Sequence, residues 1–408
     1  MPDGDDSMRL LLLTETFLPE IGGGEQQAQL LSQALARRGH EVTIVTRRSG
    51  RELPKEQIHE GVRIIRVGPA GRGRWKKWGL ALSAIPPLAR LRTGVDVVFV
   101  SGYRIMGLPA VVIARMLGRR CVLKSDSPGE MSGEFFRAGL APFHLQPTSF
   151  GVRLLVRSRN ALLRAADAFV AISTPIADEM RASGVPEDRT HYVPNGVDTT
   201  RFRPASLSER TALRSQLGLP SGRLAVYTGR LVSYKGLTLL LRVWCELCRS
   251  GMSGTLVMVG AGSADMHNCE DALGRYVAEH RLDGRVIFTG GVANVEDYLR
   301  AADVFVFPTE KEAFGVSLVE AMACGLPSVA TRAGGIADFL VDGSNGLVVE
   351  PGSFTQLRDA LTTLLAGGDR VAALGQAART TAISRFSADA VADRYVRLFE
   401  TLLEQRAV

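Results

Sequence analysis

Short apolar runs in the first half of the chain alternate with longer stretches in which apolar residues recur at helical spacing. Runs such as RLLLLTETF (9–17), EVTIVTR (41–47) and VDVVFV (95–100) are continuous and β-branched, which is typical of strands covered on both faces. Further runs of this kind are VRIIRVG (62–68), CVLKSD (121–126), DAFVAIS (167–173) and HYVPNG (191–196). Helical spacing occurs at about 25–38, 105–117 and 151–166. The alternation predicts a parallel sheet with helices on both faces.

The same rhythm restarts after a polar stretch, VPNGVDTTRFRPASLSER, which we interpret as an interdomain linker. Predicted strands follow at 223–231, 254–260, 285–290, 303–309 and 326–331, with helices at about 236–249, 265–280 and 292–302. The fold class is therefore α/β, with two doubly wound Rossmann-like domains facing across a cleft. We expect domains at 1–200 and 201–385, and a last helix over 386–408 that crosses back to the first domain.

Length and composition agree with two domains in the cytoplasm. The 408 residues are 46% apolar, and single cores stop growing near about 250–300 residues. The first ten residues carry three aspartates and no apolar core of a secretory signal. No apolar run reaches the roughly 20 residues of a membrane span. The five cysteines are scattered, which suits reduced thiols, and the CxxC spacing of Cys245 and Cys248 has no second pair that would suggest zinc.

The net charge of +7 comes from the first half of the chain. No acidic residue lies between Glu60 and Asp96, and a second basic cluster interleaves arginines with leucines near residues 153–164. The basic residues concerned are Arg63, Arg66, Arg72, Arg74, Lys76, Lys77, Arg90, Arg92, Arg153, Arg157, Arg159 and Arg164, with Trp75 and Trp78 beside the lysines. Such stretches suit peripheral contact with the inner face of an anionic membrane or a phosphorylated acceptor. The alternative is a solvated face of an Arg-rich protein. No motif supports nucleic acid binding.

The run FPTEKEAFGVSLVEAMACGLP (307–327) carries two glutamates, Glu312 and Glu320, in otherwise apolar sequence. It reads as the end of a strand, a turn and a helix. The free amide groups at the start of that helix, at Phe314, Gly315 and Val316, favour an anion such as a phosphate. Glu312 then precedes the helix and Glu320 lies just over one turn inside it.

Glu320 is surrounded in sequence by Leu318, Val319, Ala321 and Met322. A lone carboxylate there is costly unless a polar group donates hydrogen bonds to it. Ligand hydroxyls are one such partner, and a buried salt bridge is the alternative.

Two cations and three glycines complete the candidate chemistry. Arg230 and Lys235, in YTGRLVSYKG, follow the first strand of the second domain and suit a pyrophosphate. In the first domain Gly22, Gly23 and Gly24 allow close backbone approach to a ligand, although the spacing is not that of a GxGxxG dinucleotide motif.

Five motifs of the chain are TEKEAFGVSLVEAMACGLP, GRLVSYKG, AISTPIADEM, VPNGVDTTRFRP and GGGE. In their observed order they resemble the motifs of the family 4 retaining glycosyltransferases with the GT-B fold. The resemblance covers essentially the whole chain. It implies a nucleotide-sugar donor held mostly by the C-terminal domain and an acceptor held mostly by the N-terminal domain. The acceptor is a glycan, a glycolipid or a small molecule.

The resemblance also assigns roles by position. Glu320 would bind the donor ribose, and Glu312 would face the donor sugar's hydroxyls or its anomeric centre. Arg230, Lys235 and the amides near Gly315 would hold the pyrophosphate. Gly22 to Gly24 would approach the donor, and backbone near Val292 would contact its base. A UDP-sugar is expected in preference to GDP-mannose.

Charge developing on the departing diphosphate can be stabilised by these cations and the helix N-terminus. No DxD-like motif lies in a matching position, so we expect no cofactor and no divalent metal. The family implies retention of the anomeric configuration; the sequence presents no nucleophile, which favours front-face attack.

The chain departs from the family where many members carry a histidine. The strand CVLKSDSPGEM here has Lys124, Ser125, Asp126 and Ser127 at that point. Either Asp126 takes the place of the histidine against the donor sugar or the contact is lost. The alternative for Asp126 is a helix or turn cap.

Three other functions fit parts of the pattern. An NAD-dependent oxidoreductase would need GxGxxG followed by an acidic residue, and this is absent. A sugar-nucleotide epimerase on the same fold would need acid and base groups that the sequence does not identify. A non-catalytic binding module would leave both glutamates and both cations without a purpose.

Overall fold

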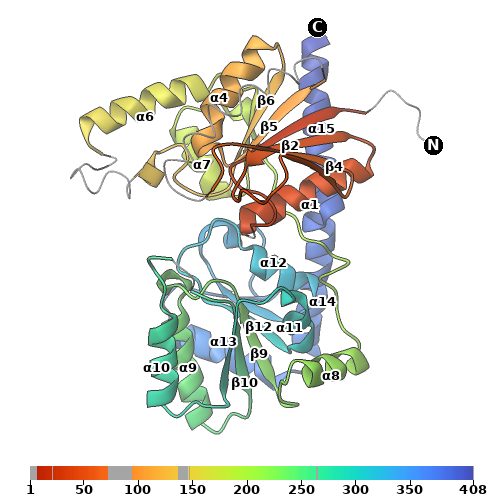
Figure 1. The fold of residues 1–408 in the computed structure, drawn as a ribbon. Coiled ribbons are helices and arrows are strands. Elements are labelled where there is room, and N and C mark those ends of the chain that lie inside the picture. The colour runs from red at the N-terminus through yellow and green to blue at the C-terminus, as the bar shows by residue number, and fades with distance from the viewer. Residues whose placement is uncertain are drawn as a thin grey trace. The chain divides into compact units, whose positions relative to one another are not determined.

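The computed structural model describes residues 7–20, 22–71, 94–136, 146, 148–262 and 265–407. The chain forms two compact units (Figure 1). Unit 1 comprises Met1–Gly196 and Val391–Val408, and unit 2 comprises Val197–Ala390. Both are α/β with parallel sheets, as the apolar pattern predicted. The most basic part of the first half, from Arg72 to Arg92, lies outside the described residues.

Unit 1 is built on an eight-stranded sheet with the order β3-β4-β2-β1-β5-β6-β7-β8. Neighbouring strands are parallel except in the β3–β4 hairpin. The strands are β1 (Arg9–Thr14), β2 (Glu41–Arg47), β3 (Glu56–His59), β4 (Val62–Val67), β5 (Val97–Ser101), β6 (Arg120–Ser125), β7 (Ala168–Ala171) and β8 (Thr190–Tyr192). The central strand β5 is buried at every position, because helices cover both of its faces.

The helices of unit 1 cover this sheet, except that α6 packs on α4. They are α1 (Gly23–Arg37), α4 (Tyr103–Met116), α6 (Phe150–Leu163), α7 (Thr174–Ala182) and α15 (Ala388–Ala407), which starts in unit 2. Helix α1 contacts β1 and β2, whereas α4 contacts β5 and β6. From the C-terminal helix, the rings of Tyr395 and Phe399 lie edge-on to Phe99 of β5 at 5.2 and 5.9 Å. The end of the chain is therefore part of the core of unit 1.

Unit 2 contains a six-stranded parallel sheet with the order β11-β10-β9-β12-β13-β14. Its strands are β9 (Leu224–Thr228), β10 (Thr255–Val259), β11 (Val286–Gly290), β12 (Val304–Phe307), β13 (Ser328–Thr331) and β14 (Leu347–Val349). β9 and β12 are adjacent at its centre. Their carboxyl ends therefore present neighbouring loops at one edge of the sheet.

Two layers of helices cover the second sheet (Figure 1). One layer holds α9 (Leu237–Arg249), α10 (Glu270–Glu279) and α13 (Phe354–Ala366), and the other holds α8 (Leu207–Gln216), α11 (Val295–Ala301), α12 (Val316–Ala323) and α14 (Asp369–Phe386). Three aromatic rings, Phe314, Phe339 and Phe386, pack together at centroid distances of 5.2 to 5.6 Å. This cluster anchors the turn before α12.

Some elements differ from the expectation. Helix α8 begins at Leu207, inside the stretch that we interpreted as linker, because Ser206 and Glu209 form a capping box at its start. The pattern did not predict β3, β14, α7, α13 or α14. The first two are short, and short strands give little periodic signal.

Candidate active site

In unit 2 the loops after β9 and β12 bring together Lys235 and Glu312, which are 77 positions apart in sequence. The Lys235 Nζ lies 2.5 Å from the Glu312 Oε2, and both side chains are largely buried. The ammonium also lies over the ring of Phe307, 5.1 Å from its centroid. Glu312 thus fixes the lysine at the carboxyl edge of the sheet. The family resemblance places this same carboxylate against the donor sugar.

Backbone contacts hold these two loops against each other. The Glu310 amide donates to the Tyr234 carbonyl at 2.9 Å. Gly236, with φ 67°, approaches so closely that a Cβ there would lie 2.0 Å from the carbonyl oxygen of Pro308. Only glycine fits at this position, so its presence in the SYKG turn follows from the contact between the loops.

Arg230 lies beside this pair but is more exposed. Its Nη1 pairs with Asp265 Oδ2 at 2.5 Å, its Nη2 donates to the Tyr234 hydroxyl at 2.7 Å, and its side chain is 58% exposed. The buried Tyr227 hydroxyl donates to the Arg230 carbonyl at 2.8 Å and fixes the backbone. A guanidinium has five N–H donors, so the arginine keeps donors for a ligand. Asp265 gave no signal in the sequence.

The turn before α12 has the geometry expected of an anion site. Gly315 adopts φ 105°, which favours glycine, and Phe314 is buried in the aromatic cluster. Helix α12 starts at Val316, so its first amide groups lack acceptors within the helix. Glu312 accepts from the Ala313 amide at 3.1 Å just before this turn.

Glu320 lies on α12 and keeps some exposed surface although dense protein surrounds it. Among the described residues its carboxylate has neither a hydrogen bond nor an ion pair, which excludes the buried salt bridge there. Nearby Arg201 pairs instead with Glu296 at 2.6 Å. Burial raises the pKa of Glu320 to about 8; Arg201 lowers this pKa and Glu296 raises it further. An unsatisfied carboxylate of this kind is available to a ligand.

Val292 follows β11 and is partly exposed. The adjacent backbone is tied to the neighbouring strand by the Gly260 amide, which donates to the Gly290 carbonyl at 3.0 Å. The loop therefore lies at the same carboxyl edge as Arg230, and β11 is separated from β12 by the two strands β10 and β9.

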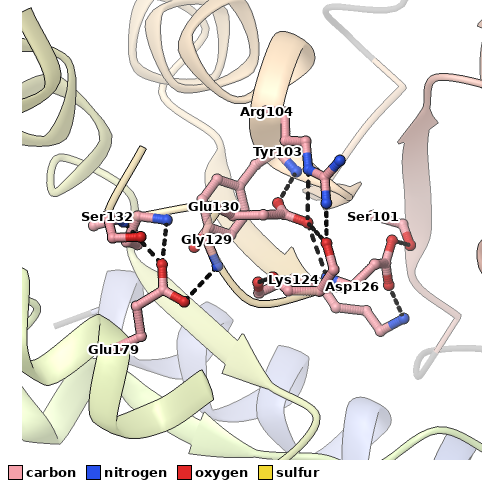
Figure 2. Close-up of polar contacts among 12 residues, drawn as sticks. Ser101, Tyr103, Arg104, Lys124, Asp126, Gly129, Glu130, Ser132 and Glu179 are labelled. Carbon is pink, nitrogen blue, oxygen red and sulfur yellow. Dashed lines mark hydrogen bonds and ion pairs between the residues drawn. The ribbon is translucent and has the colours of Figure 1, made fainter. Parts of the chain in front are cut away.

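In unit 1 the carboxyl ends of β5 and β6 surround Asp126 (Figure 2). Its carboxylate accepts from the Ser101 hydroxyl at 2.8 Å and pairs with the Lys124 ammonium. Neither partner is a backbone amide, so these contacts are not those of a turn cap. A Cβ on Gly24 would lie 3.8 Å from Asp126 Oδ2, which brings the glycine segment to the same place.

Helix α1 begins earlier than the sequence indicated, so the three glycines belong to its start. Gly22 is the residue before the helix, and Gly23 and Gly24 form its first turn. The expected glycine loop is therefore shorter, and Gly24, in the first turn of α1, lies near Asp126. The small size of glycine makes this approach of backbone to a side chain feasible.

The loop after β6 is held by two glutamates that the sequence analysis missed (Figure 2). Glu130 accepts from the amides of Tyr103 at 3.0 Å and Asp126 at 3.2 Å. Glu179 of α7 accepts from the amides of Gly129, Met131 and Ser132 at 2.6, 2.9 and 2.8 Å. Burial, and then Asp126, raise the pKa of Glu130 to about 7, while Arg104 lowers it. No local pattern could reveal these bonds, because each glutamate is a single polar residue whose acceptor role depends on distant backbone.

The predicted residues thus fall into two groups. Arg230, Lys235, Glu312, Gly315 and Glu320 lie in unit 2, and Gly22 to Gly24 and Asp126 lie in unit 1. The described part of the chain contains no group of three or more His, Cys, Asp or Glu side chains that could hold a metal ion. Nor does any helix within it have the length and apolarity to cross a bilayer.

A hollow of about 570 Å³ in unit 2 lies elsewhere. It is lined by residues that precede strands, such as Arg223, Asp303 and Pro327, and so lies at the amino edge of the sheet. Asp303 is already paired with Arg214 at 2.9 Å. None of the candidate site residues lines this hollow.

Comparison with known proteins identifies the family. The profile "Glycosyltransferase Family 4" matches residues 21–201, and "Glycosyl transferases group 1" matches residues 222–367. A D-inositol 3-phosphate glycosyltransferase of Xylanimonas cellulosilytica is 31% identical, over 95% of this chain and 93% of that protein. A GDP-mannose-dependent alpha-mannosyltransferase of Mycobacterium tuberculosis is 30% identical, over 98% of both chains.

Among solved structures, sucrose-phosphate synthase from Thermosynechococcus elongatus matches with a TM-score of 0.77 at 23% identity, over 98% of this chain and 100% of that chain. This likeness concerns the fold. Together with the sequence relatives it confirms the expected class: the chain belongs to the family 4 glycosyltransferases, has the GT-B fold and is a hexosyltransferase that acts on a nucleotide-sugar donor and an acceptor.

Proposed function

We propose that this glycosyltransferase moves a hexose or N-acetylhexosamine from a nucleoside-diphosphate sugar to an acceptor hydroxyl, with retention of the anomeric configuration and without a divalent metal. One observation carries the proposal. A buried lysine paired with a glutamate, an arginine and the start of α12 lie at one sheet edge. The carboxylate of Glu320, on the same helix, has no hydrogen bond or ion pair with any described residue. This arrangement suits a diphosphate and a ribose.

In this proposal Lys235, Arg230 and the amides from Gly315 onward bind the diphosphate. Breaking the sugar–phosphate bond leaves its electron pair on the diphosphate oxygen, so negative charge grows there. Preorganised cations and amides stabilise that charge without rearranging. The 2.5 Å contact with Glu312 supports this role for Lys235, because it fixes the ammonium before any ligand arrives.

Glu320 binds the ribose hydroxyls. Each hydroxyl donates a hydrogen bond to the carboxylate, which otherwise has no described partner. Binding therefore favours the ionised form of a group whose pKa burial raises to about 8. The backbone near Val292 would contact the nucleotide base. The Val292 side chain therefore has no part in binding the base.

Glu312 contacts the donor sugar while it holds Lys235. An ionised carboxylate has about four acceptor sites. Lys235 and the Ala313 amide use two of them, and the others can accept sugar hydroxyls. The acceptor O–H bond breaks as its oxygen attacks the anomeric carbon on the face of the departing group. The proton passes to a phosphate oxygen of the leaving diphosphate.

The acceptor side belongs to unit 1. In the same unit Asp126, held by Ser101 and Lys124, is assigned to the donor sugar in place of the family histidine. Gly22 to Gly24 are assigned to the approach to the donor. We place the reaction in the cytoplasm, in keeping with five free cysteines.

The donor base is the least constrained part of the proposal. The sequence favoured a UDP-sugar, whereas the Mycobacterium tuberculosis relative is named for GDP-mannose. Both nucleotides therefore belong in the test.

A thermal-unfolding panel with UDP, GDP, ADP and NAD⁺, each with and without EDTA, tests the proposal. A ligand at about 100 times its Kd stabilises the native state by about 2.7 kcal/mol. We expect one nucleoside diphosphate to raise the midpoint equally with and without EDTA, and to do so less in Glu320→Gln. A shift with NAD⁺ alone would overturn the transferase, and a shift abolished by EDTA would overturn metal independence.

Product analysis then separates transfer from its closest rival. With the matching sugar nucleotide, NMR of the product should show the anomeric configuration of the donor. Interconversion of the sugar nucleotide without any acceptor would instead identify an epimerase.

A further inference from the structure

Helix α6 of unit 1 exposes apolar side chains on the face that points away from the core. It packs against α4 at the outside of unit 1 (Figure 1, yellow). Phe150, Leu154, Leu155 and Leu162 are 85%, 56%, 61% and 57% exposed. Large exposed apolar residues scattered singly are ordinary, but four on one helix form a patch.

The arrangement around the helix axis makes this patch continuous. At about 100° per residue, Phe150, Leu154, Leu155 and Leu162 fall within one outer sector of about 140°. The other residues of that sector are small and uncharged, namely Gly151, Ser158 and Ala161, all of them exposed. The opposite face, with Val152, Val156 and Leu163, is buried. The helix is therefore apolar on both faces, and no charge interrupts the outer one.

Arginines run along one flank of the outer face. Arg153, Arg157 and Arg164 fall within about 40° of one another around the axis and line a hollow of about 520 Å³. Asn160, Ser132 and Ser183 also line it, and its described lining contains no acidic residue. Arg164 donates to the Ser183 carbonyl at 3.0 Å. Arg153 and Arg157 have no ion pair with any described residue.

We propose that α6 docks on an anionic phospholipid bilayer, with its four apolar side chains at the acyl boundary and its arginine flank on lipid phosphates. Apolar residues on one side and cations beside them are the composition of helices that lie in the membrane interface. Guanidinium groups bind phosphate oxygens in a bidentate manner, and the hollow beside them offers room for a headgroup.

Charge favours the bilayer over a second copy of this chain. A symmetric dimer through α6 would place the same patch on itself, and with it the same arginines from both copies. Like charges brought together in an interface are unfavourable. An anionic surface instead neutralises them. The inference goes beyond the proposed function, because vesicle binding needs neither donor nor acceptor.

Vesicle co-sedimentation of the full chain tests the inference. We expect binding to vesicles of phosphatidylglycerol and phosphatidylcholine, and little binding to phosphatidylcholine alone. Raising NaCl from 0.1 to 0.5 M should weaken binding, because salt screens exposed charges. Arg153→Gln with Arg157→Gln should lower the vesicle partition coefficient roughly 10- to 30-fold. Leu154→Ser with Leu162→Ser should lower it about tenfold or more.

Matched controls lie in unit 2. Leu207→Ser removes an exposed leucine of α8, and Arg370→Gln removes an exposed cation of α14; both should bind vesicles as the wild type does. Circular dichroism melting checks that every variant is folded. Nucleotide binding should be unchanged in the α6 variants, so a failure here is distinct from a failure of the proposed function.

Three results would overturn the inference. The first is no binding of the wild type to phosphatidylglycerol vesicles. The second is wild-type binding by the folded α6 variants, which would place docking elsewhere on the chain. The third is release from vesicles by millimolar inorganic phosphate at constant ionic strength, which would identify the arginine flank as a site for a free anion.

Discussion

Two glutamates set deep among protein atoms, one in each unit, share a raised pKa and differ in their hydrogen bonds. Glu130 in unit 1 accepts from two backbone amides and faces Arg104 at 3.6 Å. Glu320 in unit 2 has no such bond among the described residues. Burial raises the pKa of the first to about 7 and of the second to about 8. A perturbed pKa alone therefore does not separate their roles.

The difference in bonding does separate them. Because its acceptor sites are used internally, Glu130 fixes the start of α4 and the loop that carries Asp126 (Figure 2). We regard it as a positioning residue. Glu320 is bonded to nothing that the structure describes, so its acceptor sites are available to a ligand.

Glu130→Ala should lower the free energy of unfolding by about 3–5 kcal/mol, because it leaves buried amides without an acceptor and Arg104 without its partner. Nucleoside diphosphate affinity should be unchanged, since the nucleotide residues lie in unit 2. Urea denaturation and calorimetric titration measure the two quantities. Wild-type stability would show that the bonds of Glu130 do not hold the loop.

Lys235→Ala should lower turnover about 100-fold or more, equivalent to about 2.7 kcal/mol, because charge on the leaving diphosphate loses a stabilising cation. Initial-rate kinetics with saturating acceptor measure this. Arg332→Gln, which removes the exposed pair with Glu350, is the control and should retain activity. Near wild-type turnover in a folded Lys235→Ala protein would remove the lysine from the mechanism.

Glu320→Ala should weaken nucleoside diphosphate binding about 10- to 100-fold, since hydrogen bonds to a charged group contribute about 1.5–3 kcal/mol. Its stability should fall much less than that of Glu130→Ala, because no described residue loses a hydrogen-bond partner. Unaltered affinity in a titration would mean that the ribose binds elsewhere.

Taken per pH unit, the smallest effect is the dependence of stability on pH. A carboxyl whose folded pKa is raised stabilises the protein fully below its unfolded pKa of about 4.5, and this stabilisation is lost as pH rises through the folded value near 8. Between pH 5 and 8 the wild type should therefore lose stability relative to Glu320→Gln, by up to about 1 kcal/mol per pH unit.

Melting midpoints of the two proteins across that range measure this loss. Glu130→Gln should flatten the profile in the same way, with the change centred near pH 7. Parallel profiles for wild type and both variants would contradict the raised pKa values.

The sequence predicted most of the fold because buried parallel strands require continuous apolar runs and amphipathic helices require apolar residues at helical spacing. It placed a strand over residues 303–309 and a helix after Gly315, where the structure has Val304–Phe307 and Val316–Ala323. It missed β3, whose residues EQIH alternate between exposed and partly exposed positions at the edge of the sheet. Such a strand lacks the apolar run that marks the others.

For the candidate site, the sequence identified the candidate residues. The tertiary structure showed which side chains and backbone groups they contact. Local motifs singled out Glu312 and Glu320 as carboxylates in an otherwise apolar run, and Arg230 and Lys235 as two cations just after a strand. Asp126 was singled out where the chain departs from the family pattern. Nothing in these motifs indicated that Lys235 would pair with Glu312. The pairing arises because β9 and β12 are neighbours in the sheet although other strands separate them in the chain.

The sequence by itself thus determined the class of fold, the family and the chemical types at the site, since these depend on local period and spacing. Only the tertiary structure decided which of two similar glutamates has internal hydrogen bonds and which has none among the residues that it describes. Hydrogen bonds to distant backbone, such as those of Glu179 to residues 129–132, depend on where strands and helices meet in space. The same holds for the exposed apolar face of α6, because exposure depends on what the rest of unit 1 leaves uncovered.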